Sequence, residues 1–350
     1  MSAATARRWF LPLLLALALS CLAIEAPLGS EGSSMRSQIV EDLYDVQLVD
    51  PDEGWAVGAF GVVYRTSDGG RHWRLQPAPT TQNLFGVSFS DVRNGWVVGR
   101  SGTIIHTTDG GAHWRIQSSG TVKHLFKVCF IDSREGWAVG DWGVVLQTVD
   151  GGASWRDRSL GEDEIVYAID FSDRSTGWMV GELGSIRHTV DGGATWVKQP
   201  TATRKTLFGV TAVSRERAWA VGIDGLVLRT TDGGATWQAQ RGDGRTASFE
   251  NLEPAEALNN PGLYDVKIRG GKGYVVGDVG NLLVSEDAGE TWTRVLLPAQ
   301  WRLWWIRGLS VLPSGAGMVV GASGLTFAVN GHEMRFSQDA ATSPPAAPRR

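Results

Sequence analysis

Six aspartates in nearly identical surroundings are the residues of this chain that first suggest chemistry. Each stands in a motif of the form Ser/Thr-x-Asp-x-Gly-x-x-Trp, here called the Asp-box, and the six are Asp68, Asp109, Asp150, Asp191, Asp232 and Asp287. A pair of carboxylates is what a glycoside hydrolase uses, but no reaction needs the same carboxylate six times. We therefore expect each aspartate to accept hydrogen bonds from the backbone of its own turn. The glycine would supply a positive φ, and the tryptophan would bury its ring.

A second motif precedes the Asp-boxes and shows that the chain is built of repeats. Gly-Trp-x-Val-Gly, or a close variant, places tryptophans 41 residues apart, at Trp55, Trp96, Trp137, Trp178 and Trp219. Tyr274 and Met318 hold the same place in two looser copies, which makes seven repeats. A period near 40 residues with strand-like content is typical of propeller blades.

One repeat predicts four short antiparallel strands. In the second copy we expect them over residues 84–89, 96–99, 103–107 and 113–117, with a tight hairpin at residues 100–102. Runs of β-branched and aromatic residues bounded by Gly, Asn and Asp favour such a meander. The predicted fold class is therefore all-β, a seven-bladed β-propeller of four-stranded blades over residues 41–336, with an insertion at residues 241–261.

The N-terminal end of the chain predicts export. Arg7 and Arg8 precede a run of Leu and Ala that is short for a membrane span and suits a signal peptide over residues 1–20. Cys21 follows directly and is a candidate for lipidation, which the sequence leaves open because Ala18 stands where lipoproteins usually have Leu. Residues 21–40 are expected to be a linker and residues 337–350 a disordered tail. The expected location is the periplasm or another extracytoplasmic space, with or without a lipid anchor.

Charge and histidine spacing exclude several classes of ligand. Removal of residues 1–20 takes away two Arg and no acid, so the net charge goes from −4 to −6. An acidic chain without a long basic run is not expected to bind nucleic acid. No metal-ligand spacing occurs within a repeat among His72, His106, His113, His124 and His188. Neither a metal nor a cofactor is expected.

Topology predicts which end of the blades binds a partner. In an up-and-down blade, the Asp-box joins the third and fourth strands at one end. The hairpin between the second and third strands and the loop to the next blade lie at the other end. These loops vary between repeats, as a binding face requires. The predicted partner-binding residues are Arg100, Asp141, Trp142, Glu182, Asp224, Asp278, Trp304 and Trp305. The alternatives are that the acidic residues are solvated charges and that Trp142 packs on the neighbouring blade. In the cluster of Trp301, Trp304 and Trp305, some rings would close the last blade and one or two would be exposed as anchors.

The combined repeat, Gly-Trp-x-Val-Gly-x-x-Gly-x-(Ile/Val)-x-x-Thr-x-Asp-Gly-Gly-x-x-Trp, resembles that of the photosystem II stability/assembly factor propellers and their bacterial relatives. The resemblance covers about residues 41–335. It implies a non-enzymatic, exported scaffold that binds a membrane protein, in photosynthetic members through an arginine-rich surface. The strand position held here by Arg65 and Arg229 carries His106, Gln147 and His188 in other repeats. We therefore expect a non-photosynthetic relative that serves another envelope complex, such as an exporter.

Two other functions remain as alternatives. Sialidase-like glycoside hydrolases share these repeats, but they also need an arginine triad, a Tyr/Glu pair and an early Arg-Ile-Pro element that is absent here. Tyr44, Tyr167 and Tyr264 begin strands where other repeats have Phe, so a structural role is expected for them. A receptor ectodomain similar to the sortilin propeller would normally be followed by a cysteine-rich module, which this chain lacks.

Overall fold

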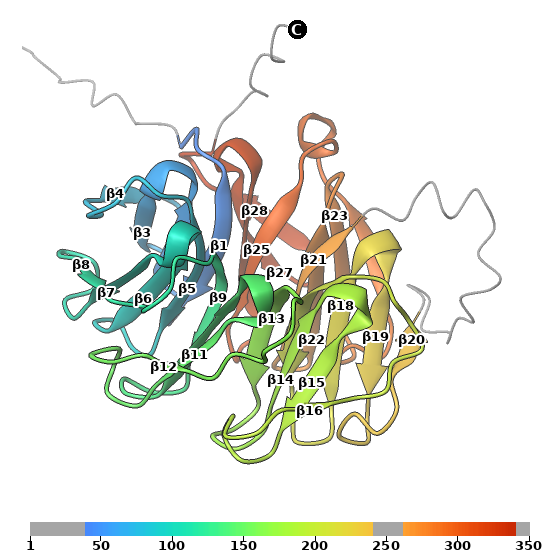
Figure 1. Cartoon of the computed structure of the whole chain (residues 1–350). Coiled ribbons are helices and arrows are strands. Elements are labelled where there is room, and N and C mark those ends of the chain that lie inside the picture. Colours follow the sequence, from blue (N-terminus) through green and yellow to red (C-terminus); the bar gives the residue numbers. More distant parts are fainter. Residues whose placement is uncertain (1–38, 241–261, 341–350) are drawn as a thin grey trace, which may run out of the picture. The chain divides into compact units, whose positions relative to one another are not determined.

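The computed structural model describes residues 39–240 and 262–340, which form seven four-stranded sheets arranged around an axis (Figure 1). In every sheet the strands follow one another in sequence order and pair antiparallel. The predicted seven-bladed propeller is confirmed. The predicted signal peptide, Cys21 and the insertion at residues 241–261 lie outside the described residues.

The strands occupy equivalent places in the seven blades. The innermost strands are β1 (Leu43–Leu48), β5 (Leu84–Phe89), β9 (Leu125–Phe130), β13 (Val166–Phe171), β17 (Leu207–Ala212), β21 (Leu263–Arg269) and β25 (Ile306–Val311). The second strands are β2 (Glu53–Gly58), β6 (Gly95–Gly99), β10 (Gly136–Gly140), β14 (Gly177–Gly181), β18 (Ala218–Gly222), β22 (Lys272–Gly277) and β26 (Ala316–Gly321).

The outer half of each blade is shorter. The third strands are β3 (Val63–Ser67), β7 (Ile104–Thr107), β11 (Val145–Thr148), β15 (Ile186–Thr189), β19 (Val227–Thr230), β23 (Asn281–Ser285) and β27 (Thr326–Asn330). The outermost strands are β4 (Arg74–Gln76), β8 (Arg115–Gln117), β12 (Arg156–Asp157), β16 (Val197–Lys198), β20 (Gln238–Gln240), β24 (Thr293–Leu296) and β28 (Glu333–Phe336).

The hydrophobic core lies between neighbouring blades. Trp55 of β2 is fully buried and stacks on Phe89 of the next blade, with ring centroids 3.7 Å apart. Trp96 stacks in the same way on Phe130 at 3.5 Å. A buried aromatic ring of this size stabilises a fold by about 3–5 kcal/mol relative to Ala. The repeated tryptophans therefore hold one blade to the next.

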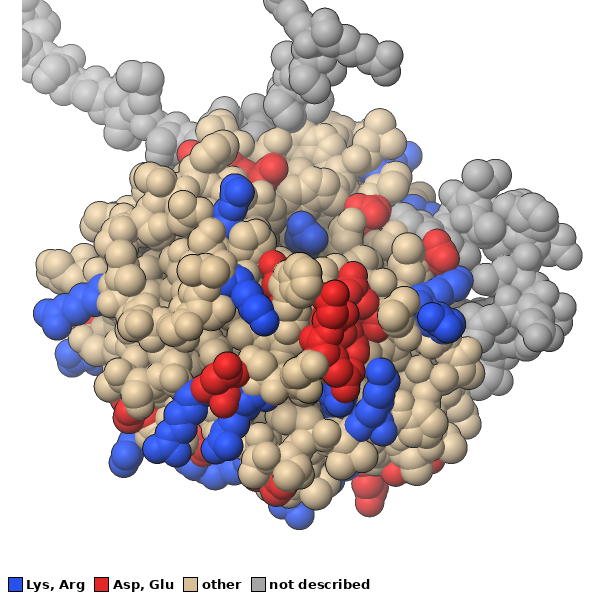
Figure 2. Space-filling model, in the orientation of Figure 1, with Lys and Arg blue, Asp and Glu red and all other residues tan. Residues whose placement is uncertain are grey.

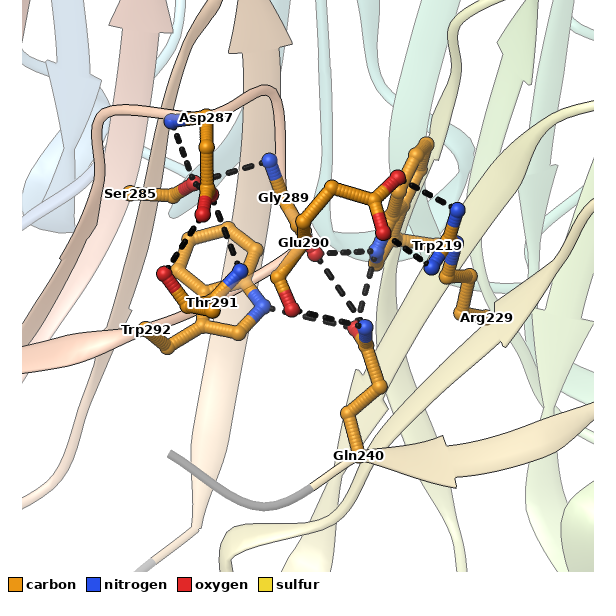
Figure 3. A network of polar contacts seen from close by, with 9 residues as sticks. All are labelled: Trp219, Arg229, Gln240, Ser285, Asp287, Gly289, Glu290, Thr291 and Trp292. Carbon is orange, nitrogen blue, oxygen red and sulfur yellow. Dashed lines mark hydrogen bonds and ion pairs between the residues drawn. The ribbon is translucent and has the colours of Figure 1, made fainter. Parts of the chain in front are cut away.

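The Asp-box turn adds a polar link between blades, shown for the sixth copy in Figure 3. Asp287 accepts hydrogen bonds from the backbone N and the hydroxyl of Thr291, at 2.9 and 2.6 Å. Gly289 N donates to Ser285 Oγ at 2.8 Å, and Trp219 Nε1 of the preceding blade donates to Gly289 O at 3.2 Å. The expected role of the aspartate within its own turn is confirmed.

The link from the indole to the next Asp-box recurs in other blades. Trp55 Nε1 donates to Gly110 O at 3.1 Å, and Trp96 Nε1 donates to Gly151 O at 3.0 Å. The sequence pattern did not reveal this contact, because its partners are 55 residues apart. The Gly-Trp-x-Val-Gly motif of one blade and the Asp-box of the next blade are thus joined by a hydrogen bond across the blade boundary.

The ring closes where blade 7 meets blade 1. Leu48 N of β1 donates to Ser310 Oγ of β25 at 2.9 Å. Residues 337–340, expected to begin a disordered tail, also contact blade 1. Asp339 is buried and accepts Trp73 N on its carboxylate at 2.7 Å, while its carbonyl oxygen accepts Ile39 N at 3.0 Å. Ser337 Oγ and Gln338 N also donate to Arg71 O, at 3.1 and 3.0 Å. Composition misses this segment because individual hydrogen bonds to blade 1 hold it.

Candidate functional site at the hairpin face

Hydrogen bonds show which loops share each end of the propeller. In blade 1, Gly69 N of the Asp-box turn donates to Asp52 O, in the turn between β1 and β2, at 3.0 Å. Ala59 N, in the hairpin between β2 and β3, donates to Asp42 O, just before β1, at 2.8 Å. The hairpins and the inter-blade connections therefore lie together, as predicted from topology. We call this end the hairpin face.

The seven hairpins share an unusual backbone conformation. Their ranges are η1 (Ala59–Gly61), η2 (Arg100–Gly102), η3 (Asp141–Gly143), η4 (Glu182–Gly184), η5 (Ile223–Gly225), η8 (Ala322–Gly324) and, in blade 6, residues 278–280. The middle residue has a left-handed φ of 48 to 59°, and the glycine after it also has a positive φ. Two left-handed residues in succession define the type I′ turn, which favours Asn, Asp or Gly at the first of them. The middle residues, here called the hairpin tips, are Phe60, Ser101, Trp142, Leu183, Asp224, Val279 and Ser323.

Four hairpin tips carry large apolar side chains into solvent. Phe60 is 74% exposed, Leu183 64%, Trp142 59% and Val279 44%. These residue types are disfavoured at a left-handed position, and their side chains gain little burial in return. A residue that conflicts with its backbone and also exposes apolar surface is typical of a binding surface.

A ring of aromatic side chains surrounds the axis at the same end. In blade 1 the pairing of β1 with β2 shifts between Leu43 and Asp45, which leaves Tyr44 as the extra residue of a β-bulge. A bulge re-aims a side chain, and here it turns the residue toward the axis. The equivalent residues, which line a cavity of about 310 Å³, are Tyr44, Phe85, Phe126, Tyr167, Phe208, Tyr264 and Arg307.

These side chains touch in sequence around the cavity. Successive aromatic rings from Tyr44 to Tyr264 have centroids 5.1 to 5.6 Å apart. Arg307 completes the circle, with its guanidinium carbon 5.0 Å from the ring centroid of Tyr264 and 5.9 Å from that of Tyr44. We call the six rings the aromatic cage. The sequence placed the tyrosines correctly at strand starts, but it did not show that they face a common cavity.

Buried ion pairs form the floor of the cage. Lys127 Nζ lies 2.8 Å from Asp45 Oδ2, and Lys267 Nζ lies 3.5 Å from Asp265 Oδ1. Burial opposes the charge on Lys127, but Asp45 and Asp265 outweigh it and raise the pKa of that ammonium. The two lysines also border a second cavity of about 610 Å³ on the other side. The cage is thus a cup, with balanced charges at its base and its mouth on the hairpin face.

Three of the predicted acidic residues lie at the rim of this cup. Asp278 Oδ1 accepts the Tyr264 hydroxyl at 2.8 Å. Burial raises the pKa of Tyr167, and the carboxylates of Glu182 and Asp141 raise it further. The rim is therefore negatively charged beside the tyrosine hydroxyls.

The other predicted residues lie elsewhere on the hairpin face. Asp224 pairs with Lys205 at 3.1 Å, and Arg100 is exposed at the start of η2. Trp305 is half-buried and stacks on Tyr44, with ring centroids 5.8 Å apart. Trp304 packs against the core of blade 7 beside Trp301, which is buried. Of the neighbouring Trp304 and Trp305, Trp305 is thus the one that borders the cage.

Charged side chains are unevenly spread over the surface. Figure 2 shows carboxylates concentrated near the middle of the visible face, with Lys and Arg around them. In the loop before β13, Glu162 and Glu164 lie 2.6 and 3.8 Å from Arg187 NH2. Lys198 Nζ also lies 3.7 Å from Glu164 Oε2, so the two carboxylates of this loop face two cations.

The strand position held by Arg65 and Arg229 was the candidate for the arginine-rich surface that the resemblance implies. Arg65 lies over Trp55 at 5.4 Å and pairs with Glu53 at 2.9 Å. Arg229 lies over Trp219 at 5.4 Å and pairs with Glu290, as Figure 3 shows. Both arginines are already paired within the fold.

The histidines at this strand position are also engaged. His106 and His188 stack on Trp96 and Trp178, with centroids 4.6 and 4.4 Å apart. Burial lowers the pKa of both histidines. Among the described blades, therefore, the position does not form a continuous basic surface.

Within residues 39–240 and 262–340, no three His, Cys, Asp or Glu side chains are placed to hold a metal ion. In the same ranges, no helix has the length and apolarity needed to cross a bilayer.

The fold and the axial cup define a seven-bladed propeller with one elaborated face. The family model described as "Photosynthesis system II assembly factor YCF48" matches residues 30–119, 71–162, 114–204, 154–241 and 200–302. Together these stretches cover well over half of the sequence, so the chain belongs to this family. A comparison with curated protein sequences finds no match.

Solved structures of several proteins share the architecture. "YCF48 bound to D1 peptide" is 19% identical with a TM-score of 0.66, and the match covers 87% of this chain and 94% of that chain. YCF48 from Cyanidioschyzon merolae is 18% identical with a TM-score of 0.63, covering 87% and 99%. A GH74 xyloglucanase from Xanthomonas campestris is 13% identical with a TM-score of 0.63, covering 87% and 53%. Because assembly factors and glycoside hydrolases share this fold, the residues must decide between binding and catalysis.

Proposed function

We propose that this chain is an exported, non-enzymatic scaffold that binds a polypeptide segment of an envelope membrane protein on its hairpin face. In this role it would support the assembly or operation of a membrane complex, such as an exporter. The observation that carries the proposal is the set of exposed apolar hairpin tips at Phe60, Trp142, Leu183 and Val279. They stand at a backbone position where each conflicts with the turn.

The surroundings of the tips suit a protein interface. Interfaces combine a few apolar anchors with a polar rim, and the hairpin face offers Arg100, Asp141, Glu182 and Asp278 beside the tips. Family membership supports an assembly role, and a solved relative with this fold holds a D1 peptide. We infer from this that a polypeptide is the natural ligand of the chain.

The hydrolase alternative is weaker because the two carboxylates inside the cup, below its rim, are already engaged. The carboxylates that line it are Asp45 and Asp265, and each is ion-paired with a lysine. Asp45 also accepts Val46 N at 3.0 Å and Val87 N at 3.0 Å. A general acid or nucleophile needs an oxygen free to face the substrate, so we infer a binding role.

Export is the part of the proposal that rests on residues 1–21. Fractionation should place the protein in the periplasm or on a membrane that faces it. A lipid label that is lost on Cys21→Ser would establish the anchor. Full-length protein in the cytosol, still starting at Met1, would contradict export.

The binding proposal is tested by capture from native membranes. Protein lacking residues 1–20 and carrying Cys21→Ser is immobilised, and captured proteins are identified by mass spectrometry. We expect an integral membrane protein in the eluate, lost with the double variant Phe60→Ser and Leu183→Ser.

The matched control for that capture is Val190→Ser, an exposed apolar residue within the Asp-box of blade 4. We expect this variant to capture the partner normally. Loss of capture in the control, with normal capture by the hairpin variant, would move the binding surface to the Asp-box end.

A further inference from the structure

We propose that the aromatic cage receives one cationic side chain, a Lys or an Arg, of the polypeptide partner, and that Arg307, in the wall of the cage, competes with this cation for the ring faces in the free protein. This inference rests on the proposed function, since the cation is supplied by the polypeptide that the hairpin face binds. It adds the chemistry that would select the partner.

The shape of the cage suits one side chain. Six rings surround a cavity of about 310 Å³, and the ion pairs below them close its base. A cup of this size admits a side chain or a small ligand, but it does not let a folded element pass. The rings from Tyr44 to Tyr264 are all half-buried, so each presents part of its surface to the cavity.

The electrostatics of the cage favour a cation. Aromatic faces carry a negative quadrupole and attract a cation within about 6 Å of the ring centroid. Around the mouth, the carboxylates of Asp42, Glu182 and Asp278 each add to the effect of burial in raising the pKa of a cage tyrosine. An anion would meet both the ring faces and these carboxylates. The paired charges at the base favour neither sign.

Arg307 already shows that the cage accepts a cation. Its guanidinium lies over Tyr44 and Tyr264, and its charge also acts on Tyr167 in blade 4. The side chain is exposed, and no carboxylate among residues 39–240 and 262–340 forms an ion pair with it. At the equivalent position the other six blades have an aromatic residue. A long, exposed side chain without a carboxylate partner can swing away when a competing cation arrives.

The test compares Arg307→Gln with the wild-type mature protein. Ligand-observed NMR measures the binding of four acetylated, amidated pentapeptides, Gly-Gly-X-Gly-Gly, in which X is Arg, Lys, Glu or Leu. Removal of the resident cation should strengthen binding of the Arg and Lys peptides about threefold to tenfold. Tyr44→Leu with Tyr264→Leu, added to Arg307→Gln, should cancel this gain. Melting curves check that each variant is folded.

Several results would overturn the proposal. Weaker binding of the cationic peptides to Arg307→Gln, or preferential binding of the Glu peptide, would make Arg307 an anchor for anions. Failure of Arg307→Gln to bind either cationic peptide would equally exclude a cation site. A Leu peptide that binds as well as the Arg peptide would show that the cage selects apolar contact and not positive charge.

The membrane capture experiment separates this inference from the proposed function. If Tyr44→Leu with Tyr264→Leu captures the membrane protein normally while Phe60→Ser with Leu183→Ser does not, the hairpin face stands and the cage proposal fails. If the cage binds cationic peptides but the wild-type protein captures no membrane protein, the proposed function fails instead.

Discussion

Replacement of Phe60 by Asn tests whether a hairpin tip serves binding and not the fold. Phe60 has φ 55° and ψ 23°, and Gly61 after it has φ 77°. This is the geometry of a type I′ turn, which favours Asn followed by Gly. The change therefore supplies the residue that the backbone prefers and removes the exposed ring.

Two effects of similar size oppose each other in the free energy of unfolding. A left-handed L-residue is disfavoured by about 1–2 kcal/mol, of which Asn recovers roughly half through local hydrogen bonding. Phe60 is 74% exposed, so about a quarter of its side-chain area of roughly 200 Å² is buried in the fold. The substitution removes this buried area. At about 25 cal/mol/Å² this loss is roughly 1 kcal/mol as an upper bound. The net change should lie within about 1 kcal/mol of zero.

Phe89→Ala is the internal comparison. Phe89 is 3% exposed and stacks on Trp55, so its truncation should destabilise the protein by about 3–5 kcal/mol. Urea denaturation of both variants measures the free energies, and membrane capture measures partner binding. An anchor residue contributes at least about 2 kcal/mol to binding, so Phe60→Asn should weaken capture roughly thirtyfold.

The reasoning is wrong if Phe60→Asn destabilises the protein by more than about 2 kcal/mol, because the ring would then be packed against the blade. It is equally wrong if stability is unchanged and capture is also unchanged, since the exposed ring would then contact nothing. Ser101→Asn serves as the matched control at the same turn position, and it should change neither quantity.

Three further predictions concern stability. Burial lowers the pKa of His106 and His188, so the unfolded chain binds more protons than the folded protein. The free energy of unfolding should therefore fall as the pH drops from about 7 to 5. Replacing both histidines by Gln, the residue at the equivalent position 147, should flatten this pH dependence in urea denaturation. Hydrogen bonds from Ser154 lower the pKa of Asp150 to about 2, so its contribution is present above about pH 4 and lost toward pH 2; the stability gap between wild type and Asp150→Asn should therefore close in acid. A Cβ at Gly289, with φ +86°, would lie 2.6 Å from Ile268 Cδ1, so Gly289→Ala should destabilise by roughly 1–3 kcal/mol, and a variant that melts like wild type would contradict the crowding.

The sequence was sufficient for the strands because each carries its own local signals. The first strand of the second repeat was placed at residues 84–89, as the structure has it, since Asn83 and Asp91 flank a run rich in apolar residues. The grouping of the hairpins with the inter-blade loops at one end followed from strand order alone. Contacts between blades were beyond local reasoning. The indole of Trp219 meets an Asp-box 70 residues further on, and no spacing within one repeat indicates this contact.

The cage was missed because a bulge breaks the two-residue alternation of a strand. Regular alternation would place Leu43 and Val46 on opposite faces of β1, yet both lie in the same core cluster. The extra residue between Leu43 and Asp45 shifts the alternation by one, so Leu43 and Val46 face the same side. Tyr44 is the bulged residue, and its side chain points toward the axis and not to either face of the sheet. A tyrosine that a regular strand would bury thus becomes part of a cavity wall.

In a repeat protein the same backbone position occurs several times with different residues. Comparison of these copies separates residues that the fold requires from residues that serve another role. The residue after each hairpin tip is Gly in all seven blades and has a positive φ in each, which marks a requirement of the turn itself. The hairpin tip before this glycine has the same left-handed conformation in every blade, but its residue type varies, with Asp224 in one blade and Trp142 in another. The turn alone would select Asn, Asp or Gly at every copy. The departures are not explained by the turn, and the exposed side chains support the proposed partner as the second constraint. Arg307 among six aromatic residues is a departure of the same kind, and it agrees with the role in recognition proposed above.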